Sequence, residues 1–231
     1  MAQTIKDRKA LETLQKECAD EAKAFKQDIL VCGGTGCHAY GCKKVIEAFR
    51  AELSKQGLDK EVRLRVTGCH GFCEMGSLAV IRPSEVFYVK ITTEDVPEIV
   101  EQTVKGGKVI DRLLYVDPAT KEKKTKVGDV PFYKNQERII FGQNGHVDPT
   151  SLRDYLAIGG YSGAAKAILD LKPGDIVNKV KESGLRGRGG GGFMTGRKWE
   201  ICAGYEADER YVVCNADEGD PGAYMDRSLL E

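Results

Sequence analysis

Several features that would place this sequence in a familiar class are missing from it. No apolar run approaches the ~18 residues that a membrane-spanning helix needs. The N-terminal segment MAQTIKDRKALETLQKECADEAK is charged throughout, so it has no targeting signal. Lys plus Arg and Asp plus Glu each number 35, which removes the electrostatic case for binding nucleic acid. We therefore expect a cytoplasmic protein that does not bind nucleic acid or insert directly into a membrane.

Cysteine, in contrast, is plentiful. The chain has eight cysteines and no secretory signal peptide. Cysteines in that context are typical of metal binding or redox chemistry rather than of a disulfide framework.

The first half of the chain alternates helical and strand patterns. Apolar residues at helical spacing predict helices over residues 4–27, 45–57 and 93–106, and short apolar or alternating runs predict strands over residues 29–31, 61–66, 78–81 and 86–91. This order favours an α/β fold with a four-stranded mixed sheet. Both cysteine loops follow predicted strands, so we expect them at one end of that sheet.

The charged stretch DPATKEKKTKVGD, residues 117–129, predicts a solvated hairpin or linker. The regions predicted around it are an N-terminal helix over residues 1–27, an α/β domain over 28–112, the linker over 113–137 and a second region over 138–231. In that second region we predict strands over 138–141 and 211–213, helices up to 158, over 162–171 and ending at 184, and a helix that carries Trp199. Asp148 is the predicted helix N-cap there.

Two cysteine pairs have the spacing of metal ligands. Cys32 and Cys37 are separated by four residues, and Cys69 and Cys73 by three. Four thiolates can hold zinc or an iron–sulfur cluster. The glycines around Cys32 favour a cluster whose sulfides accept backbone N–H bonds, and zinc remains the alternative.

Other cysteines and histidines are expected to stay outside the ligand set. Cys42 repeats the four-residue spacing, but a helix that begins there would point it away from the loop. His38 and His70 flank predicted ligands; histidine ligation is an alternative, and exposed imidazoles are the expectation. Buried free thiols are expected for the remaining cysteines, Cys18, Cys202 and Cys214.

A glycine-rich loop, SGLRGRGGGGFMTGRKW at residues 183–199, has the composition of a phosphate-binding loop. Glycines let the backbone approach a ligand and aim amides at an anion, and Arg186 and Arg188 add positive charge. A Rossmann loop is excluded because a predicted helix, not a strand, precedes it, and no Gly-Lys-Ser/Thr of a Walker motif follows. A flexible linker is the alternative, although such linkers carry Ser rather than Arg, Phe and Trp.

The motifs together resemble a known family. CGGTGC and TGCHGFC resemble the thioredoxin-like 2Fe-2S ferredoxin of the complex I flavoprotein module, and ESGLRGRGGGGFMTGRKW with VVCNADEGDPGAYMDR resembles the FMN- and NADH-binding subunit of that module. Fused in this order, they resemble the beta subunit of electron-bifurcating iron-only hydrogenases, NADP-reducing hydrogenases and NAD-dependent formate dehydrogenases. The implied fold is a thioredoxin-like 2Fe-2S ferredoxin domain followed by an incomplete α/β FMN-binding domain.

The resemblance also implies roles for individual residues. Cys32, Cys37, Cys69 and Cys73 would hold the 2Fe-2S cluster. Phe193 would contact the nicotinamide nucleotide and Lys198 the flavin phosphate. The residues implied in binding FMN and NAD(H) or NADP(H) are Gly187, Arg188, Gly189, Gly190, Gly191, Gly192, Phe193, Thr195, Gly196, Lys198, Asn215, Asp217 and Glu218, of which Glu218 is also the predicted catalytic residue.

The implied activity is that of an NAD(P)H dehydrogenase or diaphorase-type subunit. Electrons would pass between NAD(P)H, FMN and the 2Fe-2S cluster, within a hydrogenase, formate dehydrogenase or complex I-like assembly. Members of the resembled family continue beyond the point that corresponds to Glu231, so we expect a truncated or split product, or a fragment of a longer protein, with an incomplete flavin domain. The alternatives are a stand-alone 2Fe-2S carrier or docking module with a non-functional flavin-domain remnant, and a zinc-stabilised adaptor.

Overall fold

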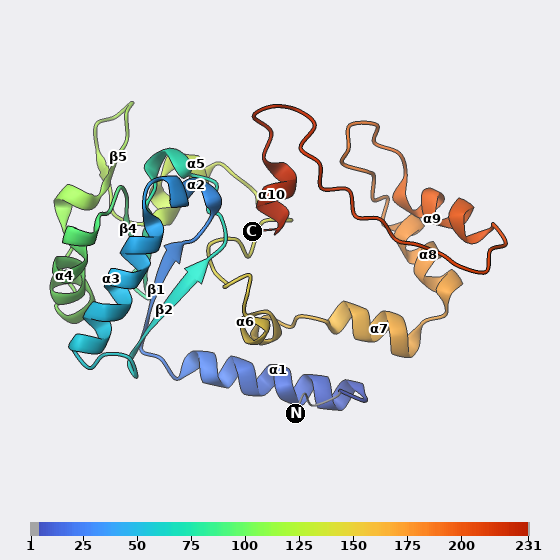
Figure 1. The fold of residues 1–231 in the computed structure, drawn as a ribbon, viewed down its shortest axis with the longest axis horizontal. Helices are drawn as coiled ribbons and strands as arrows, with labels where there is room; N and C mark the ends of the chain where they lie inside the picture. The colour runs from blue at the N-terminus through green and yellow to red at the C-terminus, as the bar shows by residue number, and fades with distance from the viewer. Residues whose placement is uncertain (1–4, 231) are drawn as a thin grey trace. The chain divides into compact units, whose positions relative to one another are not determined.

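A computed structural model describes residues 5–230 (Figure 1). The chain divides into two compact units. The sheet unit comprises Glu17–Ile158 together with the residues from Ala216 onward, and the helical unit comprises the residues up to Lys16 together with Gly159–Asn215. None of the helices between residues 5 and 230 combines the length and the apolar content needed to cross a membrane.

The sheet unit is built on the predicted four-stranded mixed sheet. Its strands are β1 (Gln27–Cys32), β2 (Val62–Thr67), β3 (Ala79–Arg82) and β4 (Val86–Tyr88), in the order β2-β1-β3-β4. β1 pairs in parallel with β2, and β3 is antiparallel to both β1 and β4. Cys32 lies opposite Thr67 at the carboxyl ends of the parallel pair. The loops that follow β1 and β2 therefore begin side by side, as the sequence predicts.

Helices pack on the sheet through apolar residues at helical spacing. α3 (Cys42–Lys55) buries the apolar set that predicts it: Val45, Ile46, Phe49 and Leu53. The helix predicted over residues 93–106 is confirmed as a run of three segments, η2 (Thr93–Asp95), α4 (Val96–Glu98) and the π-helical η3 (Ile99–Lys105). Pro97 lies in the first turn of α4, where it removes no intrahelical hydrogen bond.

The segment predicted as a hairpin or linker does form a hairpin. β5 (Tyr115–Val116) pairs antiparallel with β6 (Lys123–Lys124). The segment after it contains η5 (Val127–Asp129) and α5 (Pro131–Lys134) and packs on the core. Val130, between these two elements, is fully buried, and the Tyr133 ring of α5 meets Phe87 edge-on at 5.8 Å between centroids.

The rest of the sheet unit departs from the sequence prediction at two places. It contains α2 (Thr35–Ala39), η1 (Cys73–Met75), η4 (Asp111–Leu113), α6 (Leu152–Ala157) and α10 (Met225–Leu230). The strand predicted over residues 138–141 is wrong, because Ile139 is 83% exposed and no described strand pairs with it. The predicted N-cap Asp148 is also wrong, because the Ser151 hydroxyl accepts from the Asp154 amide at 3.2 Å and caps α6.

The helical unit contains the start of α1 (Arg8–Lys23), α7 (Ser162–Asp170), α8 (Pro173–Glu182) and α9 (Thr195–Ala203), all at predicted positions. Arg8 forms an ion pair with Asp170, which ties α1 to α7. The strand predicted over residues 211–213 is wrong. Val212 is fully exposed, and its backbone lacks a pairing strand among the described residues.

Candidate functional site

The four predicted cysteine ligands gather at the carboxyl edge of the parallel strands. Cys32 ends β1, and Cys37 lies in α2, a short helix within the loop predicted from sequence. Cys69 lies in the loop after β2, and Cys73 begins η1. The strand register therefore brings together residues that lie far apart in the sequence.

The sulfur atoms form a connected set. The Cys69 and Cys73 Sγ atoms are 4.0 Å apart, and the Cys32 thiol hydrogen-bonds with those of Cys37 and Cys69. Cys32 and Cys37 are each 1% exposed and Cys69 is 4% exposed, whereas Cys73 is half-buried. The site is thus closed toward the core and more open at Cys73.

Two glycines leave room for these sulfurs. A Cβ atom on Gly36 would lie 2.7 Å from Cys73 Sγ, and one on Gly76 would lie 3.0 Å from Cys37 Sγ. Any larger residue at Gly36 would therefore push the two loops apart. In addition, the Gly71 amide donates to Cys69 Sγ at 3.3 Å, the kind of N–H···S bond that stabilises a thiolate ligand.

The thiols of Cys32, Cys69 and Cys73 are hard to deprotonate without a nearby cation. The hydrogen bond with Cys37 is the largest cause that raises the pKa of Cys32 to about 12. Hydrogen bonding to Cys32 and then burial raise the pKa of Cys69, and burial first raises that of Cys73. Metal ions supply the positive charge that stabilises such thiolates. The donor set therefore fits a thiolate-bound iron–sulfur cluster.

Cys42 lies nearer this set than its sequence position suggests. It is the first residue of α3, so a helix begins there as predicted, and its thiol is fully buried. Burial and then the charge of Cys32 raise its pKa to about 11. Its exclusion from the ligand set stays a prediction. No three His, Cys, Asp or Glu side chains within residues 5–230 converge on the position of a single metal ion.

The expectation of an exposed His70 is wrong, whereas His38 is exposed as predicted. His70 is 4% exposed, and its Nε2 atom lies 2.8 Å from Thr67 Oγ1. Gly145, at φ +83°, packs against the ring, where a Cβ atom would lie 3.1 Å away. The loop that carries Gly145 has no counterpart in the sequence pattern, so the burial of His70 could not be foreseen.

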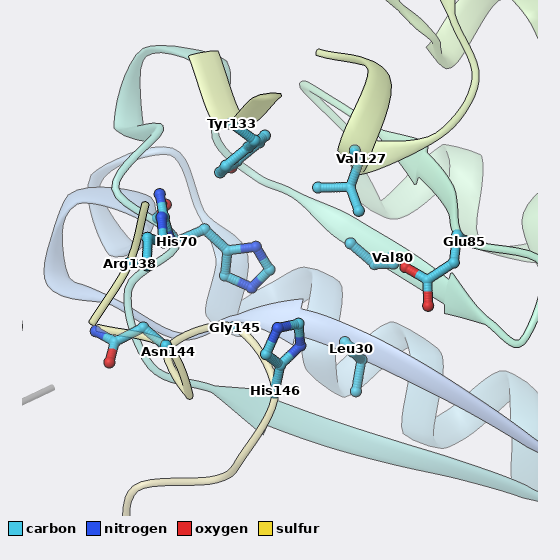
Figure 2. A pocket seen from close by; sticks show the side chains of 12 residues that line it. Leu30, His70, Val80, Glu85, Val127, Tyr133, Arg138, Asn144, Gly145 and His146 are labelled. Atoms are coloured by element: carbon cyan, nitrogen blue, oxygen red, sulfur yellow. The ribbon is translucent and has the colours of Figure 1, made fainter. Parts of the chain in front are cut away.

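A cavity of 170 Å³ adjoins His70 (Figure 2). His146, Tyr133 and Arg138 also line it. Burial first, and then the charge of His146, lower the pKa of His70 to about 3, so its imidazole is neutral. The Arg138 guanidinium donates to the His70 carbonyl at 2.9 Å. This hydrogen bond holds the segment around Arg138 against the cysteine loop that follows β2.

The remaining cysteines divide between the two units. Cys18 is buried as expected, whereas the expectation of burial is wrong for Cys202 and Cys214, which are exposed. Cys202 lies on α9, and Cys214 lies on the extended segment that was predicted as a strand.

The glycine loop forms a closed turn between α8 and α9. The Gly187 amide donates to the Phe193 carbonyl at 2.8 Å, and the Thr195 amide donates to Leu185 at 2.9 Å. Between these closures, none of the amides of residues 188–192 donates to another group of the described chain. Gly190 and Gly192 adopt positive φ angles of 99° and 58°. The loop thus presents a run of amides that suits a phosphate or another anion.

The other predicted residues of this loop differ in their surroundings. Phe193, Arg188 and Lys198 are exposed, and the Arg188 guanidinium donates to the Arg186 carbonyl at 2.7 Å. Gly196 is buried in the first turn of α9, and a Cβ atom there would lie 2.4 Å from the Lys181 amide nitrogen of α8. Gly196 therefore has a packing role between the two helices.

The predicted polar residues Asn215, Asp217 and Glu218 fall on both sides of the division between units. Asn215 ends the helical unit, whereas Asp217 and Glu218 belong to the sheet unit. The Glu218 carboxylate accepts from the Arg227 amide at 2.8 Å, so it caps the first turn of α10. This contact gives the predicted catalytic residue a structural partner.

Sequence reasoning missed two residues beside the cysteines. Gly76 follows Cys73 by three residues, and that spacing is the one signal that could have marked it. Arg227 lies far away in sequence and lines a hollow of 550 Å³ together with Cys69 and Cys73. No local pattern marks it, because its proximity depends on the placement of α10.

Two family models match parts of the chain. Residues 20–104 match the thioredoxin-like [2Fe-2S] ferredoxin family, and residues 180–231 match the Nuo51 FMN-binding domain. The chain is 55% identical over 98 residues to NADP-reducing hydrogenase subunit HndC of Solidesulfovibrio fructosivorans, a match that covers 42% of this chain and 20% of that protein. It is 51% identical over 84 residues to a subunit of the NADH-quinone oxidoreductase of Escherichia coli K12, covering 36% and 19%.

One solved structure is similar to part of the chain. The wild-type thioredoxin-like [2Fe-2S] ferredoxin from Aquifex aeolicus is 32% identical, with a TM-score of 0.36, over 39% of this chain and 96% of that chain. The matches to the two curated relatives span only about a fifth of the length of each. The similarity to the two families is confined to residues 20–104, which match the thioredoxin-like [2Fe-2S] ferredoxin model, and to residues 180–231, which match the Nuo51 FMN-binding model.

Proposed function

We propose that this chain is an electron-transfer component of a flavin and iron–sulfur oxidoreductase that oxidises NAD(P)H or reduces NAD(P). One observation carries the proposal: four cysteines converge at one edge of the sheet within a sequence of the [2Fe-2S] ferredoxin family. The match of residues 180–231 to the Nuo51 FMN-binding domain adds the flavin partner. The partners that we propose are the other subunits of a hydrogenase, formate dehydrogenase or complex I-like assembly.

In the proposed function, Cys32, Cys37, Cys69 and Cys73 bind a 2Fe-2S cluster. Burial of the first three keeps water from their sulfurs, and the Gly71 amide orients Cys69. When bound, a 2Fe-2S cluster supplies one-electron transfer, and FMN divides a two-electron hydride into one-electron steps.

The second part of the proposal concerns the glycine loop. The open amides of residues 188–192 and the guanidinium of Arg188 bind the phosphate of FMN or of the nicotinamide nucleotide. Lys198 follows in the first turn of α9, whose N-terminal end favours negative charge. Asn215, Asp217 and Glu218 are proposed to face the flavin and the nicotinamide.

A reducing compartment suits this chemistry. None of the eight cysteines forms a disulfide within the described residues, and cysteines that stay reduced are typical of cytoplasmic rather than secreted proteins. We therefore place the proposed assembly in the cytoplasm.

The test is the content of iron, acid-labile sulfide, zinc and flavin in the anaerobically isolated chain. Two iron and two sulfide per chain are expected from the proposed ligand set. Zinc without sulfide would contradict the proposal and support the zinc-stabilised adaptor. Reduction of a dye by NADH or NADPH, with bound FMN, would establish the flavin part.

A stand-alone 2Fe-2S carrier is the second candidate function. The observation that favours it is the difference in packing, because the apolar core lies in residues 29–130 whereas Tyr211 and Val213 are more than three-quarters exposed. A full complement of iron and sulfide, with no flavin and no dye reduction, would support the carrier over the dehydrogenase component.

A further inference from the structure

Helix α10 lies beside the cysteine loops of the sheet unit. A hollow of 550 Å³ is lined by Cys69 and Cys73 on the loops and by Arg227 and Ser228 on α10. The Asn144 side-chain amide donates to the Ser228 carbonyl at 3.0 Å. This bond ties α10 to the same loop that covers His70. The helix therefore has a defined place next to the more open side of the cysteine set.

Arg227 is held on α10 at both its backbone and its side chain. Its amide donates to Glu218 Oε1 at 2.8 Å. Its guanidinium carbon lies 4.3 Å from the centroid of the Tyr224 ring, a cation–π distance. The side chain is half-buried. A guanidinium is always charged and weakly hydrated, so it keeps its charge in such a place.

The charge of Arg227 lies next to the cysteine set. Arg227 is the one Lys or Arg side chain among the described residues that line the hollow with Cys69 and Cys73. Of the four cysteines, Cys73 is the least buried.

We propose that the Arg227 guanidinium places a fixed positive charge beside the metal centre. This charge stabilises the reduced state of the centre and raises its reduction potential. The inference rests on the proposed 2Fe-2S function. Reduction adds one electron, delivered in that function from reduced flavin and in the test from dithionite, and it makes the centre more negative by one charge. The net charge around an iron–sulfur cluster is one of the factors that set its potential. A nearby fixed cation favours the more negative state.

The sequence places this cation in the region that matches the Nuo51 FMN-binding domain, whereas the cysteines lie in the ferredoxin region. The potential of the centre would therefore depend on a residue outside the ferredoxin sequence. A ferredoxin region expressed without residues 216–230 would have a lower potential than the full chain.

The experiment is an EPR-monitored redox titration of the full chain, isolated anaerobically. The variants are Arg227→Gln, Arg227→Lys and the control Arg50→Gln, which removes the same charge from an exposed position on α3. We expect Arg227→Gln to lower the ratio of reduced to oxidised centre about three- to tenfold at a given potential. For a one-electron couple this is a shift of about 30–60 mV to lower potential. Arg227→Lys and Arg50→Gln should stay near the wild type.

The outcomes separate this inference from the proposed function. An intact centre in Arg227→Gln with the wild-type potential would overturn the role of Arg227 and leave the 2Fe-2S function standing. A wild-type chain without iron and sulfide would overturn both. If Arg227→Gln loses the centre, Arg227→Lys decides, because a wild-type potential supports the role of charge and a lowered potential contradicts it.

Discussion

The cysteine loops and the glycine loop differ in the groups that they offer to a ligand. The four cysteines lie in or next to two separate loops and are brought together by the parallel pairing of β1 with β2. The glycine loop is one continuous segment, and its amides are open while its side chains are exposed. In the first site the core fixes the positions of side chains, and in the second the backbone itself supplies the binding groups. Substitutions should therefore act through packing at the first and through main-chain geometry at the second.

The largest effect is expected from Cys69→Ser. Cys69 lies 4.0 Å from Cys73 and hydrogen-bonds with Cys32, so its loss breaks the centre of the sulfur set. We expect the variant to lose most of its iron and sulfide, measured by chemical analysis and visible absorption. Cys42→Ser is the matched control and should keep both. Loss of iron in the control would contradict the assignment and bring Cys42 into the ligand set.

Gly36→Ala should have the second-largest effect. This variant tests whether packing controls the cysteine site. The added methyl group would lie 2.7 Å from Cys73 Sγ. We expect the iron content to fall well below that of the wild type, while circular dichroism shows the same secondary structure. Gly128→Ala in the same unit is the control, because no atom lies within 4 Å of its Cβ position. A Gly36→Ala variant with full iron content would show that the loops can move apart freely.

Gly196→Ala tests whether packing between α8 and α9 supports the end of the glycine loop. The new Cβ atom would meet the backbone of Lys181 at 2.4 Å, so α9 must shift away from α8. Overpacking of this kind typically costs about 1–3 kcal/mol of stability. Trp199 lies on α9 and is the single tryptophan, so its fluorescence during urea unfolding reports on this contact. Gly204→Ala, with its nearest contact at 3.5 Å, should unfold like the wild type.

The smallest effect concerns pH and the loop over the cysteine edge. Burial first, and then the charge of Arg82, lower the pKa of His146 below its ordinary value of 6.5. The unfolded chain therefore binds this proton more readily, so the contribution of His146 to stability is present above pH 6.5 and is lost as pH falls toward its folded pKa. Each pH unit in that window costs at most about 1.4 kcal/mol.

His146→Gln should remove this pH-dependent loss. Urea unfolding of the wild type and the variant at pH 7.5 and pH 5.5 measures it, with the exposed His38→Gln as control. Equal pH dependence in wild type and His146→Gln would show that the imidazole is not held neutral by the fold.

The sequence predicts the elements that have their own periodicity. The strand patterns around Cys32 and Cys69 and the apolar spacing in α3 predict the mixed sheet and the meeting of the cysteine loops. Prediction from the sequence fails where a contact with a distant part of the chain decides whether a segment forms a strand or a residue is buried. Residues 138–141 and 211–213 have strand composition, but no described strand pairs with them. His70 has the sequence context of an exposed loop, and a distant loop buries it.

The same distinction applies to the candidate site. The cysteine spacing and the glycine run are local signals, and both could be recognised in the sequence. Gly196 belongs by sequence to the loop, yet its position against Lys181 gives it a packing role. Glu218 has the acidic character of a ligand, yet its carboxylate contacts the α10 backbone. Such roles depend on which surface a residue meets, which periodicity does not encode.

The parallel register of β1 and β2 has a consequence for maturation of the protein. Cys32 and Cys37 emerge from the ribosome well before Cys69 and Cys73, and the first pair alone offers only two thiols. Closing the intervening segment costs chain entropy, which pairing of the strands must offset before all four sulfurs meet. Iron and sulfide delivered earlier would meet an incomplete thiol pair. On the proposed ligation, cluster insertion therefore follows the pairing of β1 with β2, and the bound cluster then locks that strand pair in place.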